Sequence, residues 1–194
     1  VNVLDSQQAE GMVDSVVSSL GRIDILVNAV GGSTIIPNSR ATVDDLTLED
    51  WDNIIDFNLR GTFLCTNAVI KRMKQQGIGK IINLSSVAGH GATDTSSAYA
   101  TAKAGIMAFT KKVAVEAGPY GVTCNAIAPG MTLSDRILRG WEQRSEEEKR
   151  RSIEAIPLGR PAEPEDQAKV IAFLASSDAD YVTGVTIDVN GGQY

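Results

Sequence analysis

Hydrophobic positions in this chain fall into two patterns, continuous apolar runs and stripes with helical spacing. The continuous runs predict buried strands, because a parallel sheet covered on both faces needs strands that are apolar on both sides. The stripes recur every three or four residues and predict amphipathic helices. We expect strands at 1–4, 23–30, 80–84, 122–127 and 185–189, and helical segments at 9–20, 47–73, 99–117, 135–155 and 164–174. This alternation predicts an α/β fold with three α/β/α layers.

Three of the predicted strands lead into small or turn-forming residues, namely Gly31, Ser86 and Pro129. The carboxyl ends of parallel strands lie at one edge of the sheet, and ligands of open α/β sheets bind at that edge. We therefore expect the functional site where these three residues meet.

Composition narrows the class of protein. The 194 residues suit a single domain spanning 1–194, and the net charge of −6 argues against nucleic acid or an anionic membrane as a partner. No apolar run reaches the length of a membrane span. Cys65 and Cys124 lie inside apolar patterns, so we expect buried free thiols, a cytoplasmic location and no metal site. The single histidine, His90, lies in a Gly-rich stretch and is expected to be a loop residue rather than a catalytic one.

Tyr99 and Lys103 are four positions apart in a predicted helix, so their side chains lie on the same face. An adjacent ammonium favours the phenolate and is expected to lower the pKa of the tyrosine, which would suit it to acid–base chemistry. On an exposed helix the same pair would have no chemical role. Ser86 precedes Tyr99 by thirteen positions, and the intervening loop can bring the two hydroxyls together. Alone, Ser86 is a strand-end hydroxyl that local groups can satisfy.

Asn58 falls in an otherwise apolar row at 54, 58, 62 and 65 of a predicted helix. A buried amide without partners is costly, so Asn58 should hydrogen-bond to something specific. Two interpretations remain open at this point. The amide either braces a helix kink near Gly61 or serves the functional site.

Several motifs occur in the order and spacing of one family. They are Asn28-Ala29-Val30-Gly31, Asn58, Ser86, Tyr99-x-x-x-Lys103, Pro129-Gly130, the run Pro157 to Asp166, and the closing Gly184…Asn190-Gly191-Gly192. Over essentially its whole length the sequence resembles the classical short-chain dehydrogenases/reductases, and 3-oxoacyl-[acyl-carrier-protein] reductases among them. The resemblance implies a Rossmann-like, doubly wound parallel sheet.

The resemblance also implies roles for individual residues. Tyr99 would exchange the proton, Lys103 would lower the pKa of Tyr99 and hold the nicotinamide ribose, and Ser86 would orient the substrate. Asn58 would anchor a proton-relay water through a helix kink. Asn28 and Gly31 would flank the cofactor and brace the central strand. The remaining residues expected at the cofactor are Asn2, Val3, Ala29, Pro129, Gly130 and Ser134.

The sequence departs from the family pattern in three places. Ala29 stands where a second Asn is usual, and Asn2 stands where an Asp often bonds the adenine. The family opens with a strand and a Gly-rich turn that receives the pyrophosphate, and no such turn precedes Val1. We therefore expect an amino-terminally truncated chain and a sheet with open edges. These 194 residues are expected to bind a dinucleotide negligibly and to have no measurable reductase activity.

The function implied is an NAD- or NADP-dependent oxidoreductase that interconverts a carbonyl and a secondary alcohol on a small molecule. Reduction of a β-ketoacyl thioester and oxidation of a sugar, polyol or other small alcohol both fit. The alternative is a non-catalytic interaction protein, or an inactive fragment, that has lost cofactor binding. Small residues at Ala100, Ala104 and Ala108, together with the resemblance, imply a homodimer or homotetramer formed through this helix and the preceding long helix.

Overall fold

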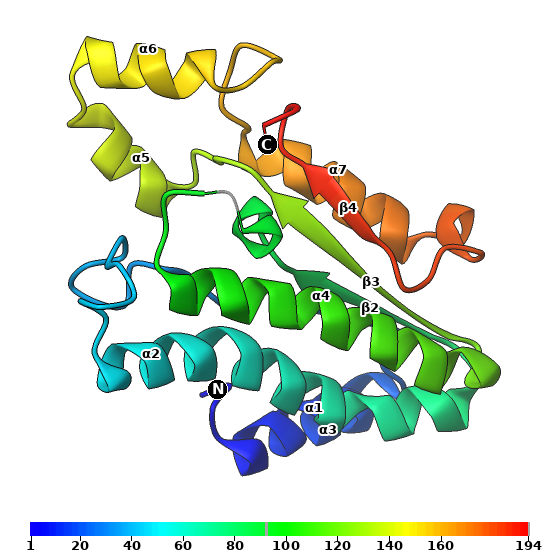
Figure 1. The fold of residues 1–194 in the computed structure, drawn as a ribbon. Coiled ribbons are helices and arrows are strands. Elements are labelled where there is room, and N and C mark those ends of the chain that lie inside the picture. The colour runs from blue at the N-terminus through cyan, green and yellow to red at the C-terminus, as the bar shows by residue number, and fades with distance from the viewer. Residues whose placement is uncertain (92, 194) are drawn as a thin grey trace.

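The computed structural model describes residues 1–91 and 93–193. Its centre is a parallel sheet of four strands in the order β1-β2-β3-β4, flanked by helices (Figure 1). The strands are β1 (Ile25–Asn28), β2 (Gly79–Leu84), β3 (Val122–Pro129) and β4 (Thr186–Val189). The α/β fold predicted from the alternating pattern is confirmed.

One face of the sheet is covered by α3 (Gly61–Gln76) and α4 (Ser97–Ala117), and α1 (Ser6–Leu20) packs against α3 (Figure 1). Their apolar stripes meet the inward side chains of the strands in one core cluster, which includes Val13, Val69, Ile81 and Cys124. The spacing of these stripes is what the sequence shows most clearly, and burying them is the main driving force for this layer.

The opposite face is covered by α7 (Pro164–Ala175), whose Leu174 packs against Ile82 and Ile127 (Figure 1). Helices on both faces make three layers. At one edge of the sheet, β1 pairs only with β2, and its Ile25 and Val27 are exposed among the described residues. Asn28 belongs to this edge strand and bonds through its side chain to Asn83 of the interior strand β2.

The helix predicted over 47–73 is interrupted. Thr47 caps α2 (Leu48–Ile55) by accepting a hydrogen bond from Asp50 N at 3.0 Å, and a π-helical segment, Asp56–Arg60, then separates α2 from α3. Such π-bulges are rare in helices and often occur at functional sites. Here Asn58 is the middle residue of the π-helical segment.

Two other predicted segments differ from the structure. Residues 2–5 form a turn, with Asp5 N bonded to Asn2 O at 3.1 Å, and no strand of the described residues pairs with residues 1–4. An apolar run becomes a strand only where a neighbouring strand can accept its hydrogen bonds. The helical region 135–155 is two helices, α5 (Asp135–Glu142) and α6 (Glu146–Glu154), because Ser145 caps α6 with a reciprocal capping box.

Short 3₁₀ turns complete the chain at Val87–His90, Gly118–Tyr120 and Ser177–Ala179. Within the described residues, no helix combines the length and the apolar character needed to cross a membrane. Helices α5 and α6 extend beyond the carboxyl ends of β2 and β3, at the upper left of Figure 1. This end of the sheet holds the predicted site.

Candidate active site

A cavity of about 270 Å³ opens at the carboxyl end of the sheet. Ser86 lines it from the end of β2, Tyr99 and Lys103 from the first turns of α4, and Pro129 from the end of β3. Strands and helix thus bring together the three side chains that the sequence singled out for chemistry. Its lining also includes the predicted Ala29, Gly31, Gly130 and Ser134.

Ser86 is held in extended backbone at the start of the 3₁₀ turn, with φ −170° and ψ 156°. Its Oγ accepts a hydrogen bond from Ala88 N at 3.2 Å. The neighbouring Ser85 donates from Oγ to Lys103 O at 2.8 Å, which ties the end of β2 to α4. These bonds fix the position of Ser86 relative to α4, the helix that carries Tyr99.

Tyr99 lies in the first turn of α4, where its N–H donates to the capping Ser96 Oγ at 3.4 Å. Burial raises the pKa of Tyr99 above its ordinary value, while the Ser86 side chain and the charge of Arg136 act in the opposite direction. The net shift of the Tyr99 pKa is therefore opposite to the lowering expected from the sequence. Desolvation of the phenolate outweighs the favourable charges.

Lys103 is almost entirely buried, and its Nζ donates to Leu84 O at 2.8 Å. The ammonium lies 5.6 Å from the centroid of the Tyr99 ring. Burial, assisted by the charge of Arg136, lowers the pKa of Lys103 to about 8. The lysine can therefore change its protonation state near neutral pH, which an exposed lysine cannot do.

Asn58 is completely buried behind the cavity rather than in its lining. Its Oδ1 accepts from Gly32 N at 2.9 Å, and its Nδ2 donates to Gly32 O at 3.1 Å and to Ile54 O at 2.9 Å. The structure combines the two open interpretations, because the amide bonds to Ile54 within the kinked helix and to Gly32, which lines the cavity. The amide joins the π-helical kink to the loop that follows β1.

Asn28 belongs to a buried polar network. Its Nδ2 donates to Asn83 Oδ1 at 2.8 Å and to Thr66 Oγ1 at 3.1 Å, and Asn83 Nδ2 donates to Thr110 Oγ1 at 2.9 Å. Asn28 and Asn83 are paired in register on β1 and β2. The network therefore joins the two strands to α3 and α4 just below the cavity.

Three predicted cofactor residues, Asn2, Val3 and Asn28, lie outside the cavity lining. Asn2 Oδ1 accepts from Leu4 N at 3.0 Å, and Val3 packs near Gly61. Sequence reasoning missed Gly32, Thr132 and Arg136, which do line it. Their proximity to Tyr99 depends on the path of the chain after β1 and β3, and the segment containing Arg136 reads as an ordinary polar helix.

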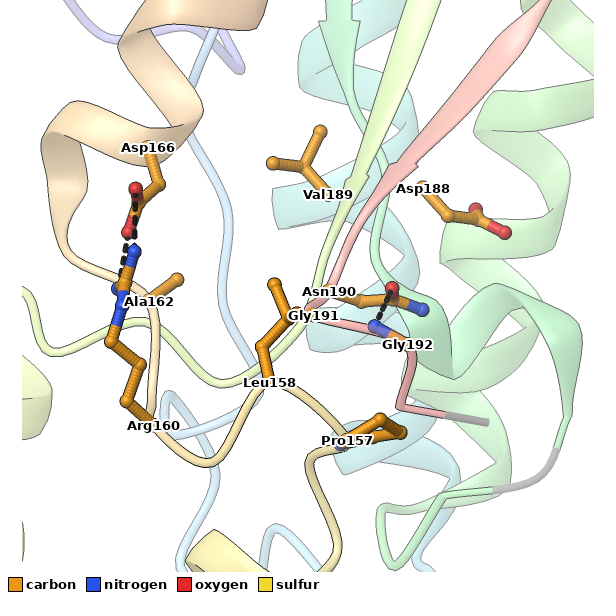
Figure 2. Close-up of a pocket in the computed structure, with 10 residues that line it drawn as sticks. All are labelled: Pro157, Leu158, Arg160, Ala162, Asp166, Asp188, Val189, Asn190, Gly191 and Gly192. Atoms are coloured by element: carbon orange, nitrogen blue, oxygen red, sulfur yellow. Dashed lines mark hydrogen bonds and ion pairs between the residues drawn. The ribbon is translucent and has the colours of Figure 1, made fainter.

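A second cavity, of about 530 Å³, lies between the loop that follows α6 and the residues after β4 (Figure 2). Arg160 and Asp166 form a bidentate ion pair there, with Nη1–Oδ2 at 2.7 Å and Nη2–Oδ1 at 3.0 Å. A Cβ at Gly191 would lie 2.8 Å from Ile156 Cγ2. The two C-terminal motifs of the sequence therefore pack against each other in this region.

Comparison with known proteins agrees with the geometry. A family model described as "Enoyl-(Acyl carrier protein) reductase" matches residues 1–193. The 3-oxoacyl-[acyl-carrier-protein] reductase FabG of Staphylococcus aureus is 40% identical over 197 residues, which is 100% of this chain and 75% of that protein. The chain belongs to the short-chain dehydrogenase/reductase family.

Solved structures give the same fold. The 3-oxoacyl-[acyl-carrier protein] reductase of Brucella melitensis superposes with a TM-score of 0.90 at 31% identity, covering 100% of this chain and 70% of that one. An ElxO variant with NADPH bound superposes with a TM-score of 0.91 at 28% identity, covering 99% of this chain and 75% of that one. The family resemblance in the sequence is confirmed, and the chain is an NAD(P)-dependent oxidoreductase.

Proposed function

We propose that this short-chain dehydrogenase/reductase reduces the 3-oxo group of an acyl thioester on a carrier protein, with Tyr99 as the proton donor. The observation that carries the proposal is the meeting of Ser86, Tyr99 and Lys103 in one cavity at the carboxyl ends of β2 and β3. The identity to 3-oxoacyl-[acyl-carrier-protein] reductases favours this substrate class over sugars and polyols.

The residues of the cavity fit the nicotinamide end of a dinucleotide. Two cations, Lys103 and Arg136, face it, and its lining among the described residues contains no Asp or Glu. The lining is rich in small residues, including Gly31 and Gly130, so a flat ring and its ribose can approach the backbone closely. We infer that Lys103 holds the ribose and that Ser134 holds the carboxamide. When bound, the nicotinamide supplies the hydride.

The protein's part in the reaction is positioning and proton transfer. Ser86 orients the substrate carbonyl by donating its hydroxyl hydrogen to the oxygen. Because burial raises the pKa of Tyr99, the phenol keeps its proton at neutral pH and is ready to donate it as charge develops on that oxygen. The Lys103 ammonium then stabilises the phenolate that remains. Asn58 acts through the backbone of Gly32 and positions the cofactor side of the cavity.

The substrate assignment is tested by steady-state kinetics with the full-length protein. The consumption of NADPH and NADH is followed with a 3-oxoacyl thioester of acyl carrier protein, a ketose and a small cyclic ketone. We expect the highest kcat/KM for the thioester. A higher kcat/KM for the ketose would instead indicate a sugar or polyol dehydrogenase. If none of the three compounds is reduced, the result supports the non-catalytic alternative.

We also propose a homo-oligomer that buries the outer faces of α3 and α4. On these helices Phe63, Val115 and Ala108 are exposed in the single chain, and the small Ala104 lies on the same face of α4 as Ala108.

A cytoplasmic location is proposed as well. It is supported by the two buried free thiols, whose pKa values burial raises, for Cys124 to about 12.

A further inference from the structure

Arg136 stands out in the catalytic cavity. It lies in the first turn of α5 and lines the same cavity as Tyr99 and Lys103. The chain as a whole carries a net charge of −6, yet the described lining of this cavity holds two cations and no carboxylate. The local field therefore has the opposite sign to the charge of the whole chain and attracts anions.

The guanidinium is poorly satisfied by the protein. Its single hydrogen bond among the described residues runs from Nη1 to Gly31 O at 3.4 Å, which is long for a charged donor. By contrast, Arg60 pairs with Asp56 at 2.9 Å, and Arg160 forms two bonds with Asp166. In the described part of the chain no carboxylate lies within ion-pair distance of Arg136. Most of its five N–H donors remain available to a ligand.

The backbone opposite Arg136 allows this placement. The guanidinium lies against Gly32, where a side chain would collide with it, and Gly32 is itself held by both polar atoms of the Asn58 amide. The charge of Arg136 also acts on the reacting groups, since it lowers the pKa of both Tyr99 and Lys103. Arg136 is itself exposed, and its repulsion of the buried Lys103 ammonium would be relieved by an anion bound beside both cations.

We infer that Arg136 binds an anionic oxygen group, a phosphate or a carboxylate, of a ligand held in the catalytic cavity. The planar fork of a guanidinium matches both groups with two parallel hydrogen bonds. Two ligands can bring such a group to this position, the diphosphate of the dinucleotide or a carboxylate on the carbonyl substrate. The inference rests on the proposed function, which identifies this cavity as the catalytic site. Its experiment measures binding as well as turnover.

The experiment compares Arg136→Gln and Arg136→Lys with Arg139→Gln in the full-length protein. Arg139 lies one turn further along α5, is exposed and is not part of the cavity lining, so its substitution changes the net charge equally. NADPH binding is titrated by nicotinamide fluorescence. In parallel, kcat/KM is measured for a 3-oxo substrate that carries a free carboxylate and for its methyl ester.

Loss of a charge-assisted hydrogen bond is expected to weaken binding by about 10-fold. If the diphosphate is the ligand, Arg136→Gln raises the Kd of NADPH by this factor. If the substrate carboxylate is the ligand, Arg136→Gln lowers kcat/KM for the acid by this factor and leaves kcat/KM for the ester unchanged. Arg136→Lys should weaken binding less than Arg136→Gln does, because the charge remains while the planar fork is lost. Arg139→Gln should change neither the Kd of NADPH nor kcat/KM.

The inference is overturned if Arg136→Gln behaves like Arg139→Gln in both measurements. It is also overturned if acid and ester lose kcat/KM equally while NADPH binding is unchanged, because that result indicates a structural role. The NADPH titration requires no turnover. Arg136-dependent binding in a protein that reduces no carbonyl would therefore refute the proposed function and leave this inference intact.

Discussion

Asn58 and Gly32 are joined by two hydrogen bonds, from Gly32 N to Asn58 Oδ1 at 2.9 Å and from Asn58 Nδ2 to Gly32 O at 3.1 Å. One side chain thereby satisfies both backbone groups of a residue that lies 26 positions away. It does so from a π-helical segment, where the regular hydrogen-bond ladder is interrupted. The geometry of the loop after β1, and so of one wall of the cavity, depends on this amide.

Asn58→Ala should therefore destabilise the protein. It would leave three buried backbone groups without their partner, the N–H and C=O of Gly32 and the C=O of Ile54, and we expect the free energy of unfolding to fall by about 3 kcal/mol. Urea unfolding measures the change. Asn53→Ala, an exposed position of α2, is the control and should change the free energy by less than about 0.5 kcal/mol. Equal effects of the two substitutions would contradict the bracing role.

Lys103 makes the stability depend on pH. Its pKa is about 8 in the folded protein against an ordinary 10.5, so between these values the unfolded chain binds a proton that the folded protein has released. The stability that this group contributes is present above pH 10.5 and is lost as the pH falls through 8. The shift corresponds to on the order of 3 kcal/mol.

Lys103→Met should remove this pH-dependent contribution to the free energy of unfolding. We expect the free energy of unfolding of the unsubstituted protein to rise from about pH 7.5 to about pH 9.5 by more than that of the variant. Urea unfolding at several pH values gives the slope for each protein, and Lys111→Met serves as the control because Lys111 is exposed on the same helix. Parallel slopes for all three proteins would rule out a depressed pKa at Lys103.

Assembly is predicted to depend on the outer face of α4. Ala108 is small and exposed there in the single chain, so Ala108→Glu should place a charge in the proposed interface and shift a dimer or tetramer toward monomer. Light scattering at micromolar protein distinguishes these species. Ser19→Glu, at an exposed position of α1, should leave the mass unchanged. A protein that is monomeric before any substitution would contradict the proposed interface.

Spacing, together with the family resemblance, led to Ser86, Tyr99 and Lys103 as the residues of the reaction. Ser86 and Pro129 follow apolar runs, and Tyr99 and Lys103 share a helix face, so local pattern and parallel topology together place them at one edge. These features depend on short-range chemistry, which the sequence displays directly.

What the sequence could not show depends on tertiary packing. The direction of the Tyr99 pKa shift reflects how deeply the phenol is buried, and the partner of Asn58 is distant along the chain. Residues 1–4 are as apolar as a strand, but strand formation requires a neighbour that no local pattern specifies. The guanidinium of Arg136 lies against Gly32, and the two residues are far apart in the sequence.

The central claim is that Tyr99 donates the proton, and Tyr99→Phe tests it most directly because only the hydroxyl oxygen is removed. The measurement is the turnover number for the 3-oxoacyl thioester in the full-length protein, with NADPH affinity and unfolding free energy measured on the same samples. The account predicts that turnover falls by at least about 10²-fold while NADPH affinity and stability stay close to those of the unsubstituted protein. Unchanged turnover in a folded, NADPH-binding Tyr99→Phe variant would contradict it.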